Sequence, residues 1–531
     1  MTVQPTMLRP ATPRPAWQVV VGLVLVLPAL VLLITSYVEP VFWTFKSSFN
    51  RFSGLRTLAG GATGESVGFD NYRKAFENGL GGAIGTTLLL ALLPLLAVLL
   101  VAPAVAWAAE NTGRTGRWVA RGLLTFPLVA FTPFGIAVAH FADGHSQLSA
   151  FWLGTFGVVT AAAALLYLAA FRSGRSPWPG VIVGGLLAVL TVLGLVLQEF
   201  AFAQVFQEAT PVLQMTRYGF VNFNFGVATA ISSVLLVPLM LLGVAATVLI
   251  IVTNLRFQVT GQATGQVTGQ VTATAREGRA WGWGPLGGLL LIVLVVTLLG
   301  IWPWLSRITD DNDKLPATFA NTWLPPLIAT LIGVSVAGLA AFGISGLRPL
   351  GRYSELLLLP FGLFLFVGAG PLVLREYAAG ATAGRLNTFL ALVPPSRVTI
   401  PALILLAMLF RGQALRREVL HQEGRPASWW SVIWPGLPML GIAYLVTWFV
   451  QAQDALWPYV NGTRTHPTGI YAVMVTMQQY GRHLDELPLA RLLPLPMLLL
   501  LLVLGLAAQL LYADRVALHY GRPERDHPPR T

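Results

Sequence analysis

Long apolar runs alternate with short polar connections along almost the whole chain. Each run is close to or longer than the roughly 20 residues that an α-helix needs to cross a bilayer. The pattern predicts twelve spans, near 17–37, 83–108, 119–141, 149–171, 179–201, 226–253, 284–305, 323–345, 354–374, 388–410, 434–453 and 488–512. The first run is too long for a signal-peptide core, so we expect it to be retained. The chain is predicted to be an all-α, polytopic membrane protein.

Composition supports the same class, because 55% of the residues are hydrophobic and only 11% are charged. The net charge of +12 is explained if the N-terminus is cytoplasmic, since most of the Arg and Lys residues between the spans then lie inside. No polar stretch has the clustered basic and aromatic residues of a nucleic-acid-binding surface. The chain has no cysteine, and its seven histidines show no ligand spacing, so no metal site is predicted.

A low-complexity tract of Thr, Gly and Gln at 256–282 predicts a flexible cytoplasmic linker between residues 1–255 and 283–531. The two flanking parts share a repeat, in which Thr87 to Arg117 aligns with Thr322 to Arg352 without a gap. Six spans in each part would make this a parallel repeat about an axis normal to the membrane. Chance similarity between Leu- and Ala-rich helices is the alternative.

A polar segment at 411–438 interrupts the second part after Phe410, and the gap between Phe171 and Gly180 is too short to hold its equivalent. Residues 413–423 predict one short helix outside the membrane, with Leu415, Val419 and Leu420 on one face. Such a helix is a docking element for another protein or for lipid headgroups. An ordinary solvated loop is the alternative.

Part of this segment, Glu418-Val-Leu-x-x-Glu423-Gly424 followed by Ile433-x-Pro435, resembles the EAA loop of permease subunits of binding-protein-dependent ABC importers. Val67 to Tyr72 and Asp454-Ala-Leu-Trp457-Pro458 are similar to runs in sugar permeases of the maltose type. Val419 and Leu420 depart from the family's alanines, and Glu423 departs from its Asp. The resemblance implies a type I importer permease fold with both partners fused in one chain, the larger partner at 1–255 and the smaller at 283–531.

In that family the loop docks into a cytoplasmic ATPase dimer, so the resemblance assigns coupling to Glu418, Val419, Leu420, Glu423 and Gly424. None of the lysines lies in a phosphate-binding loop, and we therefore expect a non-catalytic subunit without a cofactor of its own, with ATP bound by a separate subunit. An extracytoplasmic solute-binding protein is the second implied partner. The implied location is the plasma membrane of a prokaryote, with both termini cytoplasmic.

Polar and aromatic residues near the ends of spans are the candidates for contact with a sugar or oligosaccharide, because they are costly against lipid. They are Glu199, Phe202 and Gln204 in the first part, and Trp448, Gln451 and Asp454 in the second. The alternative is that Glu199 and Gln204 lie at the membrane interface and that the tryptophan anchors the helix there. Arg397 is expected to extend toward water rather than to pair with an acidic group.

Two other functions are compatible with the same pattern. Twelve spans in two parallel halves are also common in ion-coupled secondary transporters. A degenerate permease with a scaffold role would explain why only one part has the coupling segment. The first alternative predicts uptake without an ATPase.

Overall fold

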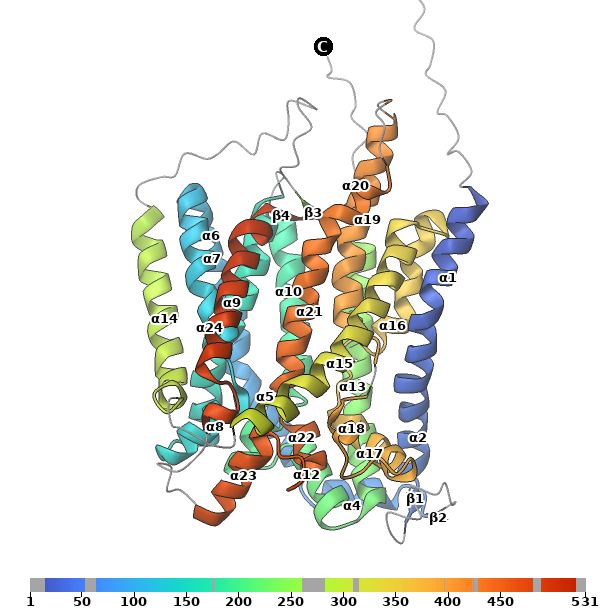
Figure 1. Cartoon of the computed structure of the whole chain (residues 1–531), viewed down its shortest axis with the longest axis vertical. Helices are drawn as coiled ribbons and strands as arrows, with labels where there is room; N and C mark the ends of the chain where they lie inside the picture. The colour runs from blue at the N-terminus through green and yellow to red at the C-terminus, as the bar shows by residue number, and fades with distance from the viewer. Residues whose placement is uncertain are drawn as a thin grey trace, which may run out of the picture.

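In the computed structural model the chain is an all-α bundle of long helices (Figure 1). The structure describes residues 15–52, 64–173, 177–259, 282–308, 315–395, 397–422, 424, 428–480 and 489–521. Within these residues, nine helical stretches are long and apolar enough to cross a membrane, and a pair of helices bent by 73° could be a tenth. The chain is therefore a multi-pass helical membrane protein.

The helices that precede residue 259 are α1 (Ala16–Leu33), α2 (Glu39–Ser48), α4 (Asp70–Glu77), α5 (Leu80–Leu96), α6 (Ala102–Asn111), α7 (Gly113–Val129), α8 (Pro133–Ala142), α9 (Gln147–Phe171), α10 (Trp178–Val196), α11 (Ala201–Phe206), α12 (Pro211–Thr216) and α13 (Phe225–Val252). Those that follow are α14 (Trp283–Leu305), α15 (Leu315–Ala341), α16 (Leu359–Gly362), α17 (Val373–Thr382), α18 (Phe389–Leu392), α19 (Ile400–Gln422), α20 (Trp430–Ile433), α21 (Leu437–Ala452), α22 (Leu456–Asn461), α23 (Gly469–Tyr480) and α24 (Leu495–Ala507). Strand β1 (Asn50–Arg51) pairs with β2 (Glu65–Ser66), and β3 (Arg256–Val259) pairs with β4 (Val516–His519).

The apolar runs become helices because a helix satisfies its own backbone hydrogen bonds, as the membrane interior demands. Several long spans continue through a π-helical turn, such as Ile34–Val38 between α1 and α2 and Ala97–Val101 between α5 and α6. The bent pair is α7 with α8, and Pro133 starts the second helix. Proline suits a first helical turn because its missing N–H would have no partner there.

The prediction of twelve spans is wrong for two segments. Residues 354–374 contain 3₁₀ turns and the four-residue α16, and the Gln198 side chain bonds to the backbone of this segment at the Phe366 carbonyl (2.7 Å) and the Gly368 N–H (2.7 Å). In 388–410 the long helix begins only at Ile400, after Pro394 and Pro395. Neither segment forms a helix that meets the length and composition of a span.

Strands β3 and β4 form a two-stranded antiparallel sheet at one end of the bundle, the end that carries residue 15 (Figure 1). Arg256 pairs with His519 and Val259 with Val516, so the sheet joins the segments that follow α13 and α24. Strand β3 packs on α19, whereas β4 packs on α9. The first four residues of the predicted linker are thus a strand, and residues 260–281 of that linker lie outside the described residues.

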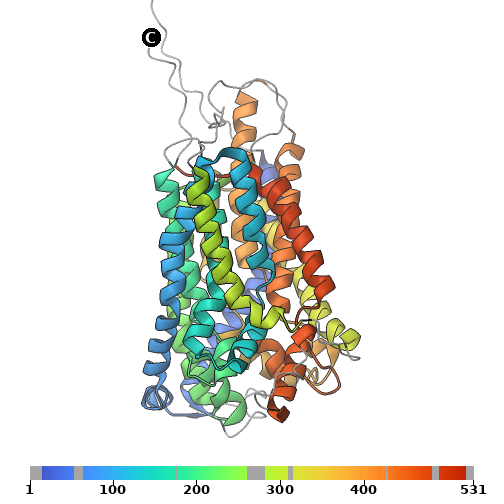
Figure 2. The same cartoon turned by 90° about the vertical axis from the view of Figure 1, so that its left-hand side faces the viewer.

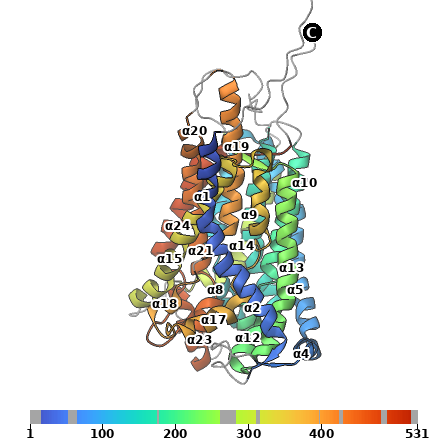
Figure 3. The ribbon, with the colours of Figure 1, turned by 90° about the vertical axis from the view of Figure 1, so that its right-hand side faces the viewer.

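Helices α1 and α14 lie on opposite sides of the bundle (Figures 2 and 3). Helix α14 packs on α9, and α1 packs on α15 and on the π-helical turn Phe342–Gly346. Gly22 and Gly343 meet at this second contact, where a Cβ on Gly343 would lie 2.6 Å from the Gly22 carbonyl oxygen. Small residues that let backbones approach closely are typical of helix contacts within membranes.

At the end of the bundle opposite β3 and β4, the segment 67–72 is hydrogen-bonded to the last residue of α2 and to Asn50 just after it. The Asn71 amide is buried and donates to the carbonyls of Ser48 (2.8 Å) and Asn50 (3.0 Å). The Tyr72 hydroxyl lies 2.7 Å from the Ser48 hydroxyl. In this structure the segment therefore connects α2 to α4 by hydrogen bonds.

Candidate functional site

A pocket of about 340 Å³ lies near the end of the bundle remote from β3 and β4, between the start of α13, α17 and α22. We call it the aromatic pocket. Its walls come from segments far apart in the sequence, and its lining consists of Gly219, Phe220, Phe223, Phe225, Tyr377, Tyr459 and Val460. Aromatic faces combined with phenol hydroxyls suit a solute that has both apolar C–H faces and hydroxyl groups.

Ring contacts fix the walls of the aromatic pocket. The rings of Phe220 and Tyr377 meet edge to face with centroids 5.1 Å apart, and those of Phe200 and Tyr459 are 5.3 Å apart. Phe223 is 62% exposed and has a φ of 53°, in the left-handed region that bulky residues rarely adopt. Such backbone strain persists only where the surrounding structure imposes it, and it clusters at functional sites.

Gln204 is the predicted substrate residue that borders the aromatic pocket. Its side chain is hydrogen-bonded to the Tyr459 hydroxyl. Burial raises the pKa of that hydroxyl, so it remains protonated at neutral pH and can act as a donor. Gln204 therefore orients one of the two phenols of the pocket.

Glu199 and Phe202, two more of the predicted substrate residues, make contacts within the protein close to Gln204. The Glu199 carboxylate accepts the backbone N–H groups of Phe202 (2.6 Å) and Ala203 (3.2 Å), and so caps the short helix α11. Phe202 is 1% exposed, and its ring packs against Phe151 at 5.2 Å. Both residues hold α11 in place, and α11 in turn carries Gln204.

Trp448 and Gln451, two of the predicted substrate residues, connect α21 to α15 by hydrogen bonds. The Trp448 indole donates to the Trp323 carbonyl (2.8 Å), and Gln451 accepts from the Thr330 hydroxyl (3.2 Å). Neither residue lines the aromatic pocket.

Asp454 accepts the Leu456 N–H (3.1 Å) at the start of α22, the helix that carries Tyr459. Burial raises the pKa of the Asp454 carboxyl, while its backbone hydrogen bonds and the charge of Arg397 oppose the shift. The carboxyl is therefore a buried group that positions one wall of the aromatic pocket.

Arg397 pairs with an acidic group, contrary to the expectation that it extends toward water. Its guanidinium lies 2.7 Å from the Glu376 carboxylate, and both side chains are largely buried, at 13% and 11% exposed. The charge of Glu376 compensates the desolvation that disfavours a buried guanidinium. Glu376 immediately precedes Tyr377, so this ion pair anchors the other wall of the aromatic pocket.

The predicted coupling residues lie at the opposite end of the bundle. The short separate helix expected at 413–423 is instead the last part of α19, which runs unbroken from Ile400 to Gln422 and projects beyond its neighbours (Figure 1). Helix α19 continues past Phe410, and Arg411, its first charged residue, is buried and has partners inside the protein. Arg411 forms an ion pair with Glu355 (3.2 Å) and donates a hydrogen bond to the Asn254 side-chain oxygen (2.5 Å).

Within this projecting end, Val419 is 47% exposed and Leu420 is partly buried. Glu418 lies 3.3 Å from Arg348. Gly424 has a φ of 73° and closes the helix with a hydrogen bond from its N–H to the His421 carbonyl (3.1 Å). Glu423 lies outside the described residues.

Trp429 holds the projecting end against the bundle. The Arg417 guanidinium lies 3.9 Å from the centroid of its indole ring. The same ring contacts Trp17 of α1 (6.0 Å) and Phe342 (6.2 Å). A displacement of the projecting end would therefore be transmitted to α1 and to the π-helical turn Phe342–Gly346 after α15.

The connection between α9 and α10 is short, and residues 174–176 within it lie outside the described residues. Helix α9 ends at Phe171 and α10 begins at Trp178. Asp514 lies 3.4 Å from Arg172 and 3.6 Å from Arg117 and Arg121. The Arg172 contact ties the connection to the 3₁₀ turn Ala513–Arg515, and the other two tie α7 to the same turn.

The sequence did not identify Phe220, Phe223 and Tyr377 as members of one pocket. The closely spaced aromatic residues from Tyr218 to Phe225 were the available signal. Among the residues described, no group of three His, Cys, Asp or Glu side chains is arranged to hold a metal ion.

No family model matches the chain, and neither the curated proteins nor the solved structures include a match.

Proposed function

We propose that this chain is the membrane subunit of an ATP-driven importer for a sugar or oligosaccharide, working by alternating access with a separate ATPase. The two membrane partners of such an importer would be fused here, as residues 1–255 and 283–531. Reciprocal packing supports this division, because β3 contacts α19 while β4 contacts α9.

The observation that carries the proposal is the projecting end of α19. An exposed apolar side chain, Val419, lies on a helix whose other end is buried in the bundle. A partner that binds there can move the part of the same helix that is buried in the bundle, without an intervening flexible joint. The segment has both features that a coupling element needs, an accessible surface and a rigid connection.

The proposed substrate class rests on the aromatic pocket. Tyr377 and Tyr459 offer ring faces for the C–H surfaces of a sugar, and their hydroxyls can bond to its oxygens. Each of these walls is held by a partly buried carboxylate, Glu376 or Asp454. The substrate would pass from a solute-binding protein to this pocket at the outer end of the bundle.

The proposed orientation places β3, β4 and the projecting end of α19 in the cytoplasm of a prokaryote. Arg117, Arg172, Arg348 and Arg411 lie at this end of the bundle, as expected for the cytoplasmic side. Both termini and the linker would then be cytoplasmic.

Co-expression with candidate ATPase subunits tests the proposal. Affinity purification of the tagged chain in mild detergent should recover an ATPase in stoichiometric amount. Recovery of the folded chain alone, with every candidate ATPase soluble and expressed, would argue against an ATP-driven importer.

Ion-coupled transport is a second candidate, favoured by the buried ionisable groups Asp454, Glu376 and Arg397. Intramembrane or buried ionisable residues are typical of proton relays. This candidate predicts uptake that follows an ion gradient in vesicles free of ATPase. A degenerate permease would show neither activity.

A further inference from the structure

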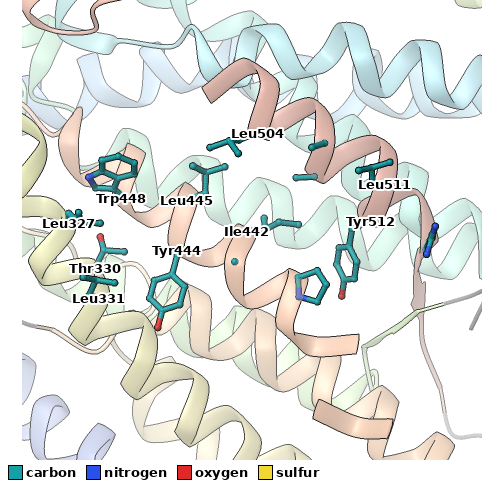
Figure 4. A pocket seen from close by; sticks show the side chains of 15 residues that line it. Leu327, Thr330, Leu331, Ile442, Tyr444, Leu445, Trp448, Leu504, Leu511 and Tyr512 are labelled. Atoms are coloured by element: carbon teal, nitrogen blue, oxygen red, sulfur yellow. The ribbon is translucent and has the colours of Figure 1, made fainter. Parts of the chain in front are cut away.

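A second cavity, of about 630 Å³, lies between α15, α21 and α24 (Figure 4). We call it the lateral groove. Trp448 lies at one end and Tyr512 at the other, with Ile442 and Leu445 between them (Figure 4). All three helices belong to candidate spans, and the span that contains α24 is the least buried of those described. The groove is therefore at membrane depth, where the surrounding medium is lipid.

The hydroxyl and indole groups that line the lateral groove already donate to other protein atoms. A sugar in this groove would leave its hydroxyls without hydrogen-bond partners, whereas a hydrocarbon chain has no hydrogen bonds to lose. The bonds are Thr330 Oγ1 to Gln451 Oε1 (3.2 Å), Trp448 Nε1 to the Trp323 carbonyl (2.8 Å), the Tyr512 hydroxyl to the Pro435 carbonyl (2.7 Å), and the Tyr444 hydroxyl to Ser335 Oγ (2.6 Å), which itself donates to the Leu331 carbonyl (2.6 Å).

The length of the lateral groove matches one leaflet of a bilayer. It follows α21 from Pro438 to Trp448, which is about 15 Å of helix. The hydrocarbon core of a membrane is about 30 Å thick, so each leaflet contributes about half of that. A groove of this length, open from the side, fits one acyl chain.

A basic residue completes the groove at its Tyr512 end. Arg515 lines this end, is exposed, and directly precedes β4. A guanidinium at the depth of the headgroups pairs well with a phosphate, and basic sites between transmembrane helices bind anionic lipid headgroups. The charge therefore lies where a lipid in the groove would have its phosphate.

We propose that the lateral groove binds a phospholipid, with one acyl chain along α21 and its phosphate at Arg515. The site is separate from the aromatic pocket and does not depend on which solute the chain transports. An anionic phospholipid of the leaflet at the β3–β4 end is the expected ligand.

Gly441 allows the lateral groove to be filled without a clash. It lines the groove, and a Cβ built on it meets no atom within 4 Å. Gly441→Leu therefore places a side chain in the space that the acyl chain would occupy. Gly287→Leu is a matched control, because Gly287 is exposed on α14 and its Cβ also meets open space.

Native mass spectrometry of the detergent-purified chain measures the retained lipid. We expect one phospholipid per chain in wild type and Gly287→Leu, and about tenfold lower occupancy in Gly441→Leu. Arg515→Gln should lower the retention of phosphatidylglycerol relative to phosphatidylcholine from an equimolar mixture. Phosphatidylglycerol with a photoactivatable acyl chain should label peptides of α15, α21 and α24.

Equal lipid occupancy in Gly441→Leu and wild type would overturn the proposal, as would a wild-type chain that retains no lipid. Cross-links that join these peptides to a second copy of the chain would also overturn it, because the groove would then be a protein interface. Thermal unfolding of both glycine variants should match wild type, which separates loss of lipid from loss of fold.

Discussion

Arg348 bonds to Glu418 at the base of the projecting end of α19, with Nη1 3.3 Å from the carboxylate. Arg348 has a φ of 52° and also lies 3.8 Å from Glu355. One guanidinium therefore connects the turn after α15 to the part of α19 that we propose as the coupling element. In the proposed transporter, this contact would carry motion of the ATPase to two helices at once.

Glu418→Lys should uncouple ATP hydrolysis from uptake, because a second positive charge beside Arg348 repels the helix from the turn. Glu418→Gln should be much milder, since Glu418 is 46% exposed and a screened ion pair of this kind contributes at most about 1 kcal/mol. ATPase activity and uptake, measured together in proteoliposomes, check this. Normal uptake by the lysine variant would remove Glu418 from the coupling pathway.

Val419→Asp should weaken ATPase binding about tenfold or more while leaving the fold intact. Val419 has an exposed side chain, and burying a valine against a partner is worth roughly 1.5–3 kcal/mol. His421→Asp is the control, since His421 is exposed two residues further along the same helix. The measurement is binding of the purified ATPase to each variant in nanodiscs. An equal loss of ATPase binding in both variants would indicate an effect of the added negative charge and not a contact at Val419.

Tyr377→Ala and Tyr459→Ala should each raise the KM for the transported solute about tenfold, because each removes one aromatic face of the pocket. Tyr353→Ala is the matched control, since Tyr353 is exposed outside the pocket and stacks on Arg352. Initial rates of uptake over a range of solute concentrations give the values. An unchanged KM in both pocket variants would place the solute site elsewhere.

Glu376→Gln should destabilise the protein by about 3–5 kcal/mol, because it leaves the buried Arg397 charge without its partner. Replacing both residues by methionine should be much less harmful, since neither charge of the pair then remains. Thermal unfolding in detergent distinguishes the two. A double variant as unstable as the single one would show that the pair is needed for reasons other than charge balance.

Asp454→Asn should remove a pH dependence of stability. Burial raises the pKa of this carboxyl above its ordinary value of 3.8. The folded protein then binds the proton more tightly than the unfolded chain, so stability falls as the pH rises from 3.8 through the raised pKa. The asparagine variant should therefore be more stable than wild type at pH 7 and similar to it near pH 4, as judged by unfolding temperatures across that range. A less stable variant at pH 7 would mean that the ionised carboxylate is favourable.

Hydropathy predicted most of the spans, because a long apolar run inside a membrane must satisfy its own backbone hydrogen bonds and therefore forms a helix. It failed at 354–374, where the Gln198 amide, distant in sequence, bonds to the backbone and stabilises an irregular path. It also placed the end of a span at Phe410, since Arg411 and Gln413 look like loop residues. Their burial depends on Glu355 and on strand β3, which no local pattern reveals.

The candidate site was only partly accessible to sequence reasoning. Gln204 was identified and borders the aromatic pocket, whereas Trp448 and Gln451 contact α15 instead. Tyr377 was missed because its place beside Phe220 depends on the Arg397–Glu376 pair and on chain segments far apart in sequence. Local composition indicates which residues are costly in a membrane, but it does not indicate which of them face the same cavity.

Uptake of oligosaccharide by proteoliposomes tests the central claim most directly. The vesicles would contain this chain, a co-purified ATPase and a solute-binding protein, with no ion gradient across the membrane. The account predicts uptake that requires ATP hydrolysis, persists with ionophores and is reduced in Val419→Asp. Uptake that proceeds without the ATPase and collapses with the ion gradient would contradict it.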